Sequence, residues 1–261
     1  YNKNEVGNIP TSDGIIHGAG DELYNNASEF YRAENGQPIG YFWGYKTAGI
    51  FQNTQEIDEW RAAGNGILQS NVQPGDVRFV DRNHDGQIND KDKVNLGNGT
   101  PDFTLGLNLG FVYKGFDFSI VANGAFGQQI VQSYRNHTRP TPNYTTAILD
   151  RWHGEGTSNR IPRVTDSNIN YQFSDLFIQN GDYLRLSTLT LGYDFAKLFK
   201  GKAVSQARLY FQVQNLFTIT GYDGMDPEIG FGSSNNSWVS GLDYGYYPRP
   251  RTVLVGVNLK F

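Results

Sequence analysis

Oxygen-bearing side chains recur at fixed spacing in the run 81–92 of this chain. Oxygen ligands stand at its first, third, fifth and twelfth positions, and Gly86 stands at the sixth. This is the spacing of an EF-hand-like metal loop, in which the glycine permits a sharp turn and the residue after it supplies a main-chain oxygen. The predicted ligands are Asp81, Asn83, Asp85, Gln87, Asn89 and Asp92.

Two features qualify this metal site. The twelfth position is Asp92 rather than glutamate, which weakens bidentate capture or requires a tighter loop, and Asn89 would bind directly or through a water. A polar turn rich in Asp and Asn is the simpler alternative. The metal is favoured because six positions match in one frame, so we expect a structural Ca²⁺ ion, with Mg²⁺ as the other candidate.

The remaining reactive side chains form no recognisable catalytic group. The chain has no cysteine, and its four histidines show neither HxxH nor HExxH spacing. No serine lies in a GxSxG turn. These observations predict that the chain is not an enzyme, and a net charge of -4 without a basic stripe argues against nucleic acid as a partner.

Aromatic side chains in the long polar segments are candidates for substrate contact, because aromatic faces stack on sugar rings and on apolar peptide side chains. Anchoring at a membrane surface, packing within loops and contact with another protein are the alternatives. The candidates are Trp152, Tyr171, Tyr222, Trp238, Tyr244 and Tyr246, with Tyr247 beside them.

The elements that must position these residues are long alternating strands. Apolar and polar residues alternate in five segments, and in the third of them the phase shifts by one residue near Ser187 and Thr188, as a β-bulge would produce. The segments are 103–113, 116–126, 183–195, 207–217 and 252–261.

Strand length distinguishes a membrane protein from a soluble one here. Strands of globular proteins usually run to about five or six residues, whereas a tilted strand needs about 9–11 to cross a bilayer. Hydrophobic content of 38% and a mean hydropathy of -0.52 suit a barrel in which only alternate residues meet lipid. We therefore predict an all-β fold, a transmembrane antiparallel β-barrel with long extracellular loops.

Five strands are too few to close such a barrel, which needs an even number of at least about eight. We expect the missing strands on a preceding segment or a separate chain. Alternating short turns and long loops place the C-terminus in the periplasm. The predicted organisation is a mainly extracellular loop region at 1–101 that contains the metal loop, followed by C-terminal barrel strands at 102–261 with extracellular loops at 127–182 and 218–250.

Several short motifs, in consistent order along nearly the whole chain, resemble the C-terminal part of SusC-like (RagA-like) TonB-dependent transporters. They are Pro38-Ile39-Gly40, Gly49-Ile50-Phe51-Gln52, Pro74 to Asp81, Pro101-Asp102-Phe103, Arg151-Trp152, Asp182 to Leu186, Leu191-Gly192-Tyr193, Gln214 to Phe217, Asp226-Pro227-Glu228, Tyr247-Pro248 and the terminal Phe261.

The resemblance implies a plugged barrel of about 22 strands in the outer membrane, importing oligosaccharides or peptides with energy from TonB. It also implies a SusD-like surface lipoprotein as a lid, with the N-terminal barrel and plug segment and outer-membrane lipid as further partners. Since the chain lacks a recognisable export signal, TonB-contacting segment and plug, we expect TonB to act through the N-terminal part of the receptor.

Two other classes stay open at this point. One is a small outer-membrane enzyme or adhesin barrel, which would need eight or more strands. The other is a secreted or surface soluble β-protein with a structural calcium site that binds carbohydrate.

Overall fold

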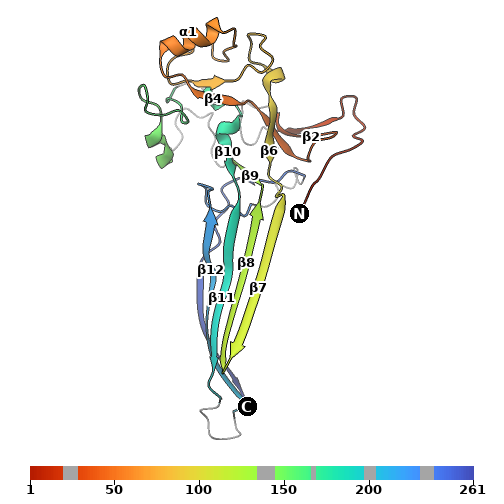
Figure 1. Ribbon diagram of the computed structural model, residues 1–261, viewed down its shortest axis with the longest axis vertical. Helices are drawn as coiled ribbons and strands as arrows, with labels where there is room; N and C mark the ends of the chain where they lie inside the picture. The colour runs from red at the N-terminus through yellow and green to blue at the C-terminus, as the bar shows by residue number, and fades with distance from the viewer. Residues whose placement is uncertain (20–28, 134–144, 166–168, 197–203, 230–237) are drawn as a thin grey trace.

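The computed structural model describes residues 1–19, 29–133, 145–165, 169–196, 204–229 and 238–261 (Figure 1). Its strands are β1 (Ile15–Ala19), β2 (Glu29–Glu34), β3 (Tyr41–Gly44), β4 (Thr47–Ile50), β5 (Val77–Phe79), β6 (Val94–Asn98), β7 (Phe103–Tyr113), β8 (Phe116–Phe126), β9 (Gln129–Gln132), β10 (Ile178–Asn180), β11 (Tyr183–Asp194), β12 (Gln206–Thr220), β13 (Leu242–Asp243) and β14 (Thr252–Lys260). Its helices are α1 (Thr54–Ala62) and the 3₁₀ turns η1 (Asp90–Asp92), η2 (Thr146–Asp150), η3 (Ile169–Tyr171) and η4 (Asp175–Phe177). Among these residues, no helix is both long and apolar enough to cross a membrane.

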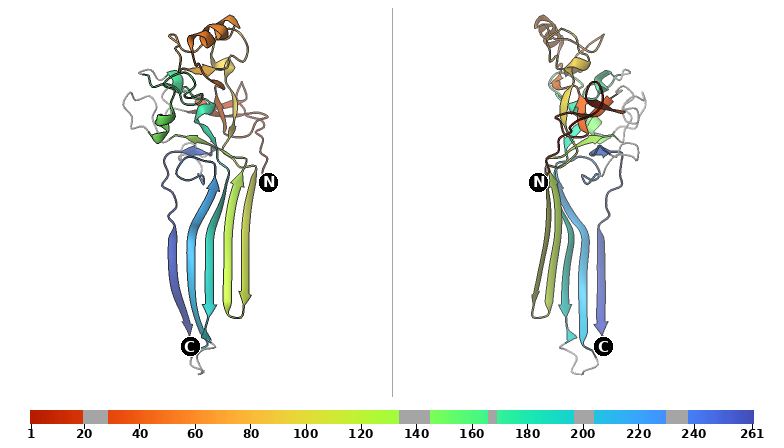
Figure 2. Two further views of the ribbon diagram at one scale, coloured as in Figure 1. Left: turned by 60° about the vertical axis from the view of Figure 1, so that its left-hand side comes forward. Right: turned by 90° about the vertical axis from the view of Figure 1, so that its right-hand side faces the viewer.

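A large antiparallel sheet occupies one end of the molecule. Its strand order is β14-β12-β11-β8-β7, and its strands contain 9 to 15 residues. They coincide with the five predicted segments to within three residues at each end. The sheet stands alone below the remaining elements, with the C-terminus at its far end (Figures 1 and 2). It is open, with β14 and β7 as its edges.

The predicted bulge is present. The register shifts between Leu186 and Thr188 in both pairings of β11, so Ser187 has no regular partner on β8. On the other side, Asn215 and Leu216 of β12 oppose this one residue, and Asn215 adopts a φ of 51°. The bulge keeps apolar side chains of β11 on one face of the sheet on both sides of the phase change.

The turn between β7 and β8 consists of Lys114 and Gly115, with φ values of 49° and 92°. Two consecutive positive φ angles define a type I′ turn, whose twist matches that of the strands it joins. This tight turn lies at the same end of the sheet as the C-terminus (Figure 1).

The other end carries a folded head, which we define as the described residues of 1–101, 127–181 and 221–250. It contains three smaller sheets, in the orders β1-β2-β3-β6, β10-β9-β13 and β4-β5. The region 1–101, predicted as mainly loop, therefore forms regular structure over much of its length. The predicted loop 218–250 also begins later than expected, because β12 extends to Thr220.

The core of the head brings together residues far apart in sequence. One cluster of buried side chains joins all three of its segments, and it consists of Phe30, Tyr31, Phe42, Val131, Phe173, Val239 and Leu242. A second, smaller cluster lies under the predicted metal loop and consists of Tyr45, Val77, Phe79 and Ile88. The loops of the barrel prediction are thus one packed unit rather than separate connections.

Helix α1 begins where the sequence signals a start. The Asn53 side chain accepts a hydrogen bond from the Glu56 amide at 3.0 Å, which satisfies one of the free N–H groups of the first turn. Ile57 is buried on the inner side, and the Trp60 indole donates to the Gly66 carbonyl at 3.1 Å. This contact brings the helix close to the segment that leads into the metal loop.

Candidate functional site

The large sheet has one apolar face that the rest of the described residues do not cover. Cross-strand pairing aligns apolar residues in continuous rows, one of which runs through Phe111, Phe118, Leu191, Phe211 and Val255. The exposed fractions are 60% for Phe111 and 71% for Val255. An uncovered apolar surface of this extent marks an interface with lipid or with another protein.

The opposite face of the same strands is polar. Its rows pass through Ser119, Thr190 and Gln212, while Asp117 and Arg208 form an ion pair across the intervening β11. The guanidinium of Arg208 donates to both carboxylate oxygens of Asp117, at 2.7 and 2.5 Å. Gly192 lies between them, and a side chain there would collide with the Asp117 carboxylate. The two faces of the sheet therefore differ in polarity, with Leu254, the partner of Gln212, as an apolar exception on the polar side.

The predicted metal loop has its first ligand in a buried, amide-lined position. Asp81 is 1% exposed, and its Oδ2 accepts hydrogen bonds from the amides of Gly66 and Gly86 at 2.8 and 2.9 Å. Burial raises the pKa of the Asp81 carboxyl, but amide donors from Gly66, Gly86, His84 and Asp85 outweigh this and hold the pKa below its usual value. The amides of His84 and Asp85 lie near the carboxylate without hydrogen-bond geometry, so the other oxygen, Oδ1, is buried and has no hydrogen-bond donor among the described residues. A charged carboxylate with one free oxygen is suited to a cation.

Both carboxylate oxygens of the last predicted ligand, Asp92, already accept hydrogen bonds from backbone amides of the loop. Asp92 Oδ1 accepts from the Arg82 amide at 2.9 Å, and Oδ2 accepts from the Asn89 amide at 2.8 Å. In the middle of the loop, Asn83 donates to Asp85 at 2.8 Å. Within the described residues, no group of three or more His, Asp or Glu side chains lies close enough together to hold a metal.

The predicted aromatic contacts fall into two groups. Tyr222 is 6% exposed, and its hydroxyl donates to the Asp243 carboxylate at 2.5 Å. The ring centroid of Trp238 lies 4.8 Å from that of Tyr31 in the head core. Tyr244 also packs against that core, and the Trp152 indole donates to Gln52 at 3.2 Å. These four side chains hold the head together.

The other two predicted aromatics are accessible. Tyr171 lines a cavity of about 290 Å³ together with Phe177, whose ring centroid lies 6.3 Å from that of Tyr171. Tyr246 is 45% exposed. Of the six candidates, Tyr246 is the exposed one, and Tyr171 is half-buried but lines this cavity.

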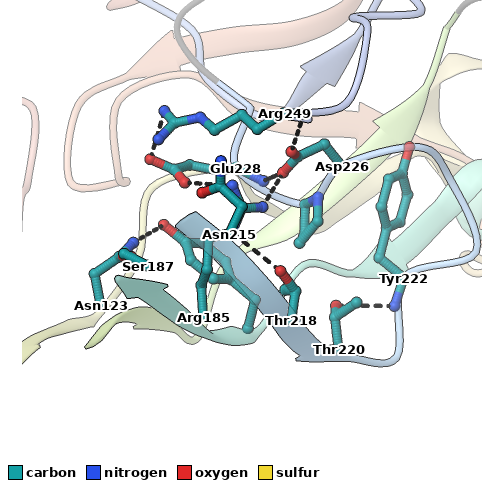
Figure 3. A network of polar contacts seen from close by, with 12 residues as sticks. Asn123, Arg185, Ser187, Asn215, Thr218, Thr220, Tyr222, Asp226, Glu228 and Arg249 are labelled. Carbon is teal, nitrogen blue, oxygen red and sulfur yellow. Dashed lines mark hydrogen bonds and ion pairs between the residues drawn. The ribbon is translucent and has the colours of Figure 1, made fainter. Parts of the chain in front are cut away.

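A charged cluster joins the polar face of the sheet to the head. Arg185 of β11 reaches Asp226 at 2.5 Å and Glu228 at 3.2 Å, and Arg249 contacts Glu228 at 2.8 Å (Figure 3). The motifs around Arg185 and Asp226 were visible in the sequence, but nothing in their spacing indicated that they meet. An arginine on the polar phase of a predicted strand was the available signal.

Comparisons with known proteins identify the relatives of this chain. It is 32% identical over 272 residues to TonB-dependent receptor P3 of Formosa agariphila, and the match covers 100% of the chain and 26% of that receptor. It is 28% identical over 263 residues to TonB-dependent receptor SusC of Bacteroides thetaiotaomicron, covering 100% of the chain and 24% of SusC. The chain matches a segment of SusC-like TonB-dependent receptors. The resemblance predicted from the motifs is thereby confirmed.

Solved structures agree with the fold of a SusC-like receptor. The RagAB peptide transporter matches with a TM-score of 0.67 and 18% identity, over 98% of this chain and 26% of that one. The RagAB peptide importer in the closed-closed state also gives a TM-score of 0.67. At this identity the likeness concerns the fold, which confirms the predicted class of all-β barrel strands. No protein-family profile matches the chain.

The SusC-like segment spans about a quarter of the curated receptors it matches, at 26%, 28% and 24% of their lengths. Each receptor is matched over the whole of this chain. The head and the large sheet therefore both belong to the shared architecture.

Proposed function

We propose that this chain forms part of the wall of an outer-membrane importer, together with an extracellular head that receives the cargo. The observation that carries the proposal is the two-faced sheet. Its apolar rows suit the hydrocarbon of the membrane, and its polar rows suit an aqueous passage. A soluble carbohydrate-binding β-protein fits less well, because residues such as Val255 and Phe111 would face water.

Orientation follows from the connections. Outer-membrane barrels have short turns on the periplasmic side and longer loops outside. The two-residue turn at Lys114 and Gly115 lies at the C-terminal end of the sheet, and the head lies at the other end (Figure 1). We therefore assign the C-terminus to the periplasm and the head to the cell surface.

The cargo and partners are proposed from the relatives. SusC and the RagAB peptide importer suggest bulky nutrients, either oligosaccharides or peptides. A SusD-like lipoprotein would dock on the head and close over the passage, and energy from TonB would arrive through other parts of the intact receptor. Tyr171 and Tyr246 are the aromatic residues we assign to solute contact.

The lid can be tested by purifying the intact receptor from outer membranes in a gentle detergent. We expect a surface lipoprotein to co-purify in near-equal amount, with a buried contact above about 2,000 Å², as in permanent complexes. Deleting residues 54–62, which form α1 at the tip of the head, tests whether this helix is part of the surface on which the lipoprotein docks. Recovery of a folded receptor alone would contradict the lid and leave the head as a self-contained cap.

We also propose that loop 81–92 binds Ca²⁺, or Mg²⁺ as the weaker alternative, through Asp81, Asn83, Asp85, Gln87, Asn89 and Asp92. The free, buried Oδ1 of Asp81 supports this assignment. So does the hydrogen bond from the Gly86 amide, which folds the sixth position of the loop back onto the first. Cation binding would draw Asn83 and Asp85 toward Asp81.

A further inference from the structure

A short segment of the head lies against the polar face of the large sheet. Arg185 lies on that face, because its cross-strand partners are Asn123 and Thr218, and its Nε donates to the Thr218 hydroxyl at 3.0 Å. The segment 221–229 supplies Asp226 and Glu228 to this arginine (Figure 3). The contact therefore joins a strand to a segment that follows the next strand in sequence.

Burial shows that this is a covered region of the polar face. Arg185 is 3% exposed, and Asp226 is 8% exposed. Tyr183, two residues from Arg185 on the same face, is also buried. Further from the head, Thr190 and Gln212 on the same face are only half-buried. Among the described residues, the head thus covers the polar face at one end and leaves Thr190 and Gln212 partly accessible.

The cluster is balanced in charge, and the contact between Arg185 and Glu228 is an ion pair without hydrogen-bond geometry. Two arginines face two carboxylates, and Arg249 closes the group by contacting Glu228 at 2.8 Å, while its amide donates to Asp226 at 3.3 Å. The Glu228 amide donates to Asp226 at 2.9 Å, which fixes the spacing of the two acids. Removing the Arg185 guanidinium would leave the buried Asp226 carboxylate without its ion-pair partner, which strongly disfavours the packed arrangement, whereas Glu228 would keep Arg249.

We propose that Arg185 is a positioning residue that holds segment 221–229 over the passage side of the wall, narrowing the passage at the end nearest the head. The proposal rests on the proposed function, because the polar face must line an aqueous passage. Tyr222 ties the start of this segment to Asp243 of the head, whereas Arg185 ties Asp226 and Glu228 of the same segment to the wall.

The second arginine pair on the same face provides a matched control. Arg208 forms a bidentate ion pair with Asp117, and both residues belong to strands of the large sheet. Breaking this pair removes an arginine–carboxylate ion pair from the polar face of the wall without touching segment 221–229. A general loosening of the wall and a release of the segment can therefore be distinguished.

The experiment measures the distance between two spin labels in the intact receptor, reconstituted in lipid nanodiscs. The chain has no cysteine, so Met225→Cys in the segment and Gln212→Cys on the polar face can be labelled specifically once any cysteine elsewhere in the receptor is replaced. Met225 is 54% exposed, which favours labelling. The parent should give one narrow distance distribution.

We expect Arg185→Gln to widen this distribution and shift it to longer distances. The double variant Asp226→Asn with Glu228→Gln should do the same from the other side of the cluster, whereas Arg208→Gln should leave the distribution narrow. An unchanged distribution in both cluster variants, in protein whose strands remain folded, would overturn the positioning role.

A second measurement separates this inference from the proposed function. A water-soluble nickel chelate should relax a label at Gln212→Cys more than one at Phe211→Cys, and oxygen, which partitions into lipid, should do the reverse. A reversed pattern would overturn the assignment of the two faces, whatever the distance measurement shows. A normal pattern with an unchanged distance would reject only the role of Arg185.

Discussion

The large sheet and the head are both antiparallel β-structures, but they place their apolar residues in opposite ways. In the sheet, Phe111 and Val255 are 60% and 71% exposed, on a face that no other part of the described chain covers. In the head, Phe30 and Phe42 are 0% exposed and pack in a core built from three segments. The same residue types are therefore on the outside of one region and on the inside of the other.

The difference between the two regions lies in what covers their apolar faces. Alternation along a strand fixes only that apolar residues share a face, and the partner of that face must come from elsewhere. For the head, the partner is another part of the same chain. For the sheet, the proposed partner is lipid, and the ladder of backbone hydrogen bonds between strands satisfies the peptide groups there.

The largest loss of stability is expected when a buried side chain is removed from the head core. Phe42→Ala should destabilise the head by about 3–5 kcal/mol, because it leaves a cavity in a fully buried aromatic cluster. Hydrogen exchange in the intact receptor should show faster exchange for amides of β2 and β3 and unchanged protection in β8 and β11.

Phe111→Ala in the sheet is the matched control for this variant, since it removes the same side chain from an exposed position. In both the head and the sheet, Phe111→Ala should change hydrogen exchange much less than Phe42→Ala changes it in the head. Equal loosening of head and sheet by Phe42→Ala would mean that the two regions unfold as one unit.

Reversing the polarity of the sheet should have the next largest effect. Arg at Val257, on the apolar face, should cost roughly 2–4 kcal/mol of folding free energy in lipid if the residue lies near the midplane. Arg at the neighbouring Asn258 should cost little, because that residue lies on the polar face. Folding titrations of the two variants into vesicles test this, and equal tolerance of Arg at both positions would reject the membrane assignment.

The predicted metal loop belongs to the head, so we expect a bound cation to stabilise the head and not the large sheet. We expect the loop to bind Ca²⁺ with a dissociation constant of about 10⁻⁴ to 10⁻³ M. The distance from the ion to each ligand oxygen should be about 2.3–2.6 Å. Asp81→Ala combined with Asp85→Ala should abolish this binding and increase exchange over residues 75–100. The strands beyond Asp102 should remain paired.

Asp90→Ala is the control for the metal variants, because Asp90 is an exposed acid of the same loop that pairs with Lys93 and is not a predicted ligand. It should retain Ca²⁺ binding measured by calorimetry. A high-resolution map in millimolar Ca²⁺ that shows only a water beside Asp81 would exclude the site.

The smallest expected effect concerns pH in the first hairpin of the head. A hydrogen bond with Glu29 raises the pKa of His17 against the opposing effect of burial, and Asp13 adds a weaker contribution. Because the pKa is raised on folding, this contribution to stability is complete below about pH 6.5 and is lost as the pH rises through the folded pKa. With its side chain 55% exposed, His17 should contribute little.

An NMR titration of the His17 ring tests this prediction. Glu29→Gln should lower the pKa of His17 more than Asp13→Asn does, because the bond to Glu29 is the main cause of the shift. A pKa unaffected by Glu29→Gln would show that the hairpin does not hold the two side chains together.

The strands of the large sheet could be predicted from the sequence because their signal is local. Alternation over ten or more residues gave the segments, and the phase change at Ser187 gave the bulge. The turn at Lys114 and Gly115 followed from the short gap between two such segments. Strand ends were predicted less closely, because alternation fades near a turn, and β12 extends three residues further than predicted.

The candidate site was predictable only in part. The spacing of loop 81–92 pointed to Asp81, whose carboxylate the structure buries among amides. Aromatic composition could not distinguish Trp238, which packs in the core, from Tyr246, which is exposed. That distinction depends on which distant segment covers each ring.

The sequence by itself determined the length, phase and two-faced character of the strands, since these properties arise from neighbouring residues in one extended segment. Only the tertiary structure decided that the three polar segments share one core and that Arg185 meets Asp226, 41 residues away along the chain. The physical reason is that burial and ion pairing depend on distances in space between segments that fold together, and no periodic pattern within either segment records the identity of its partner.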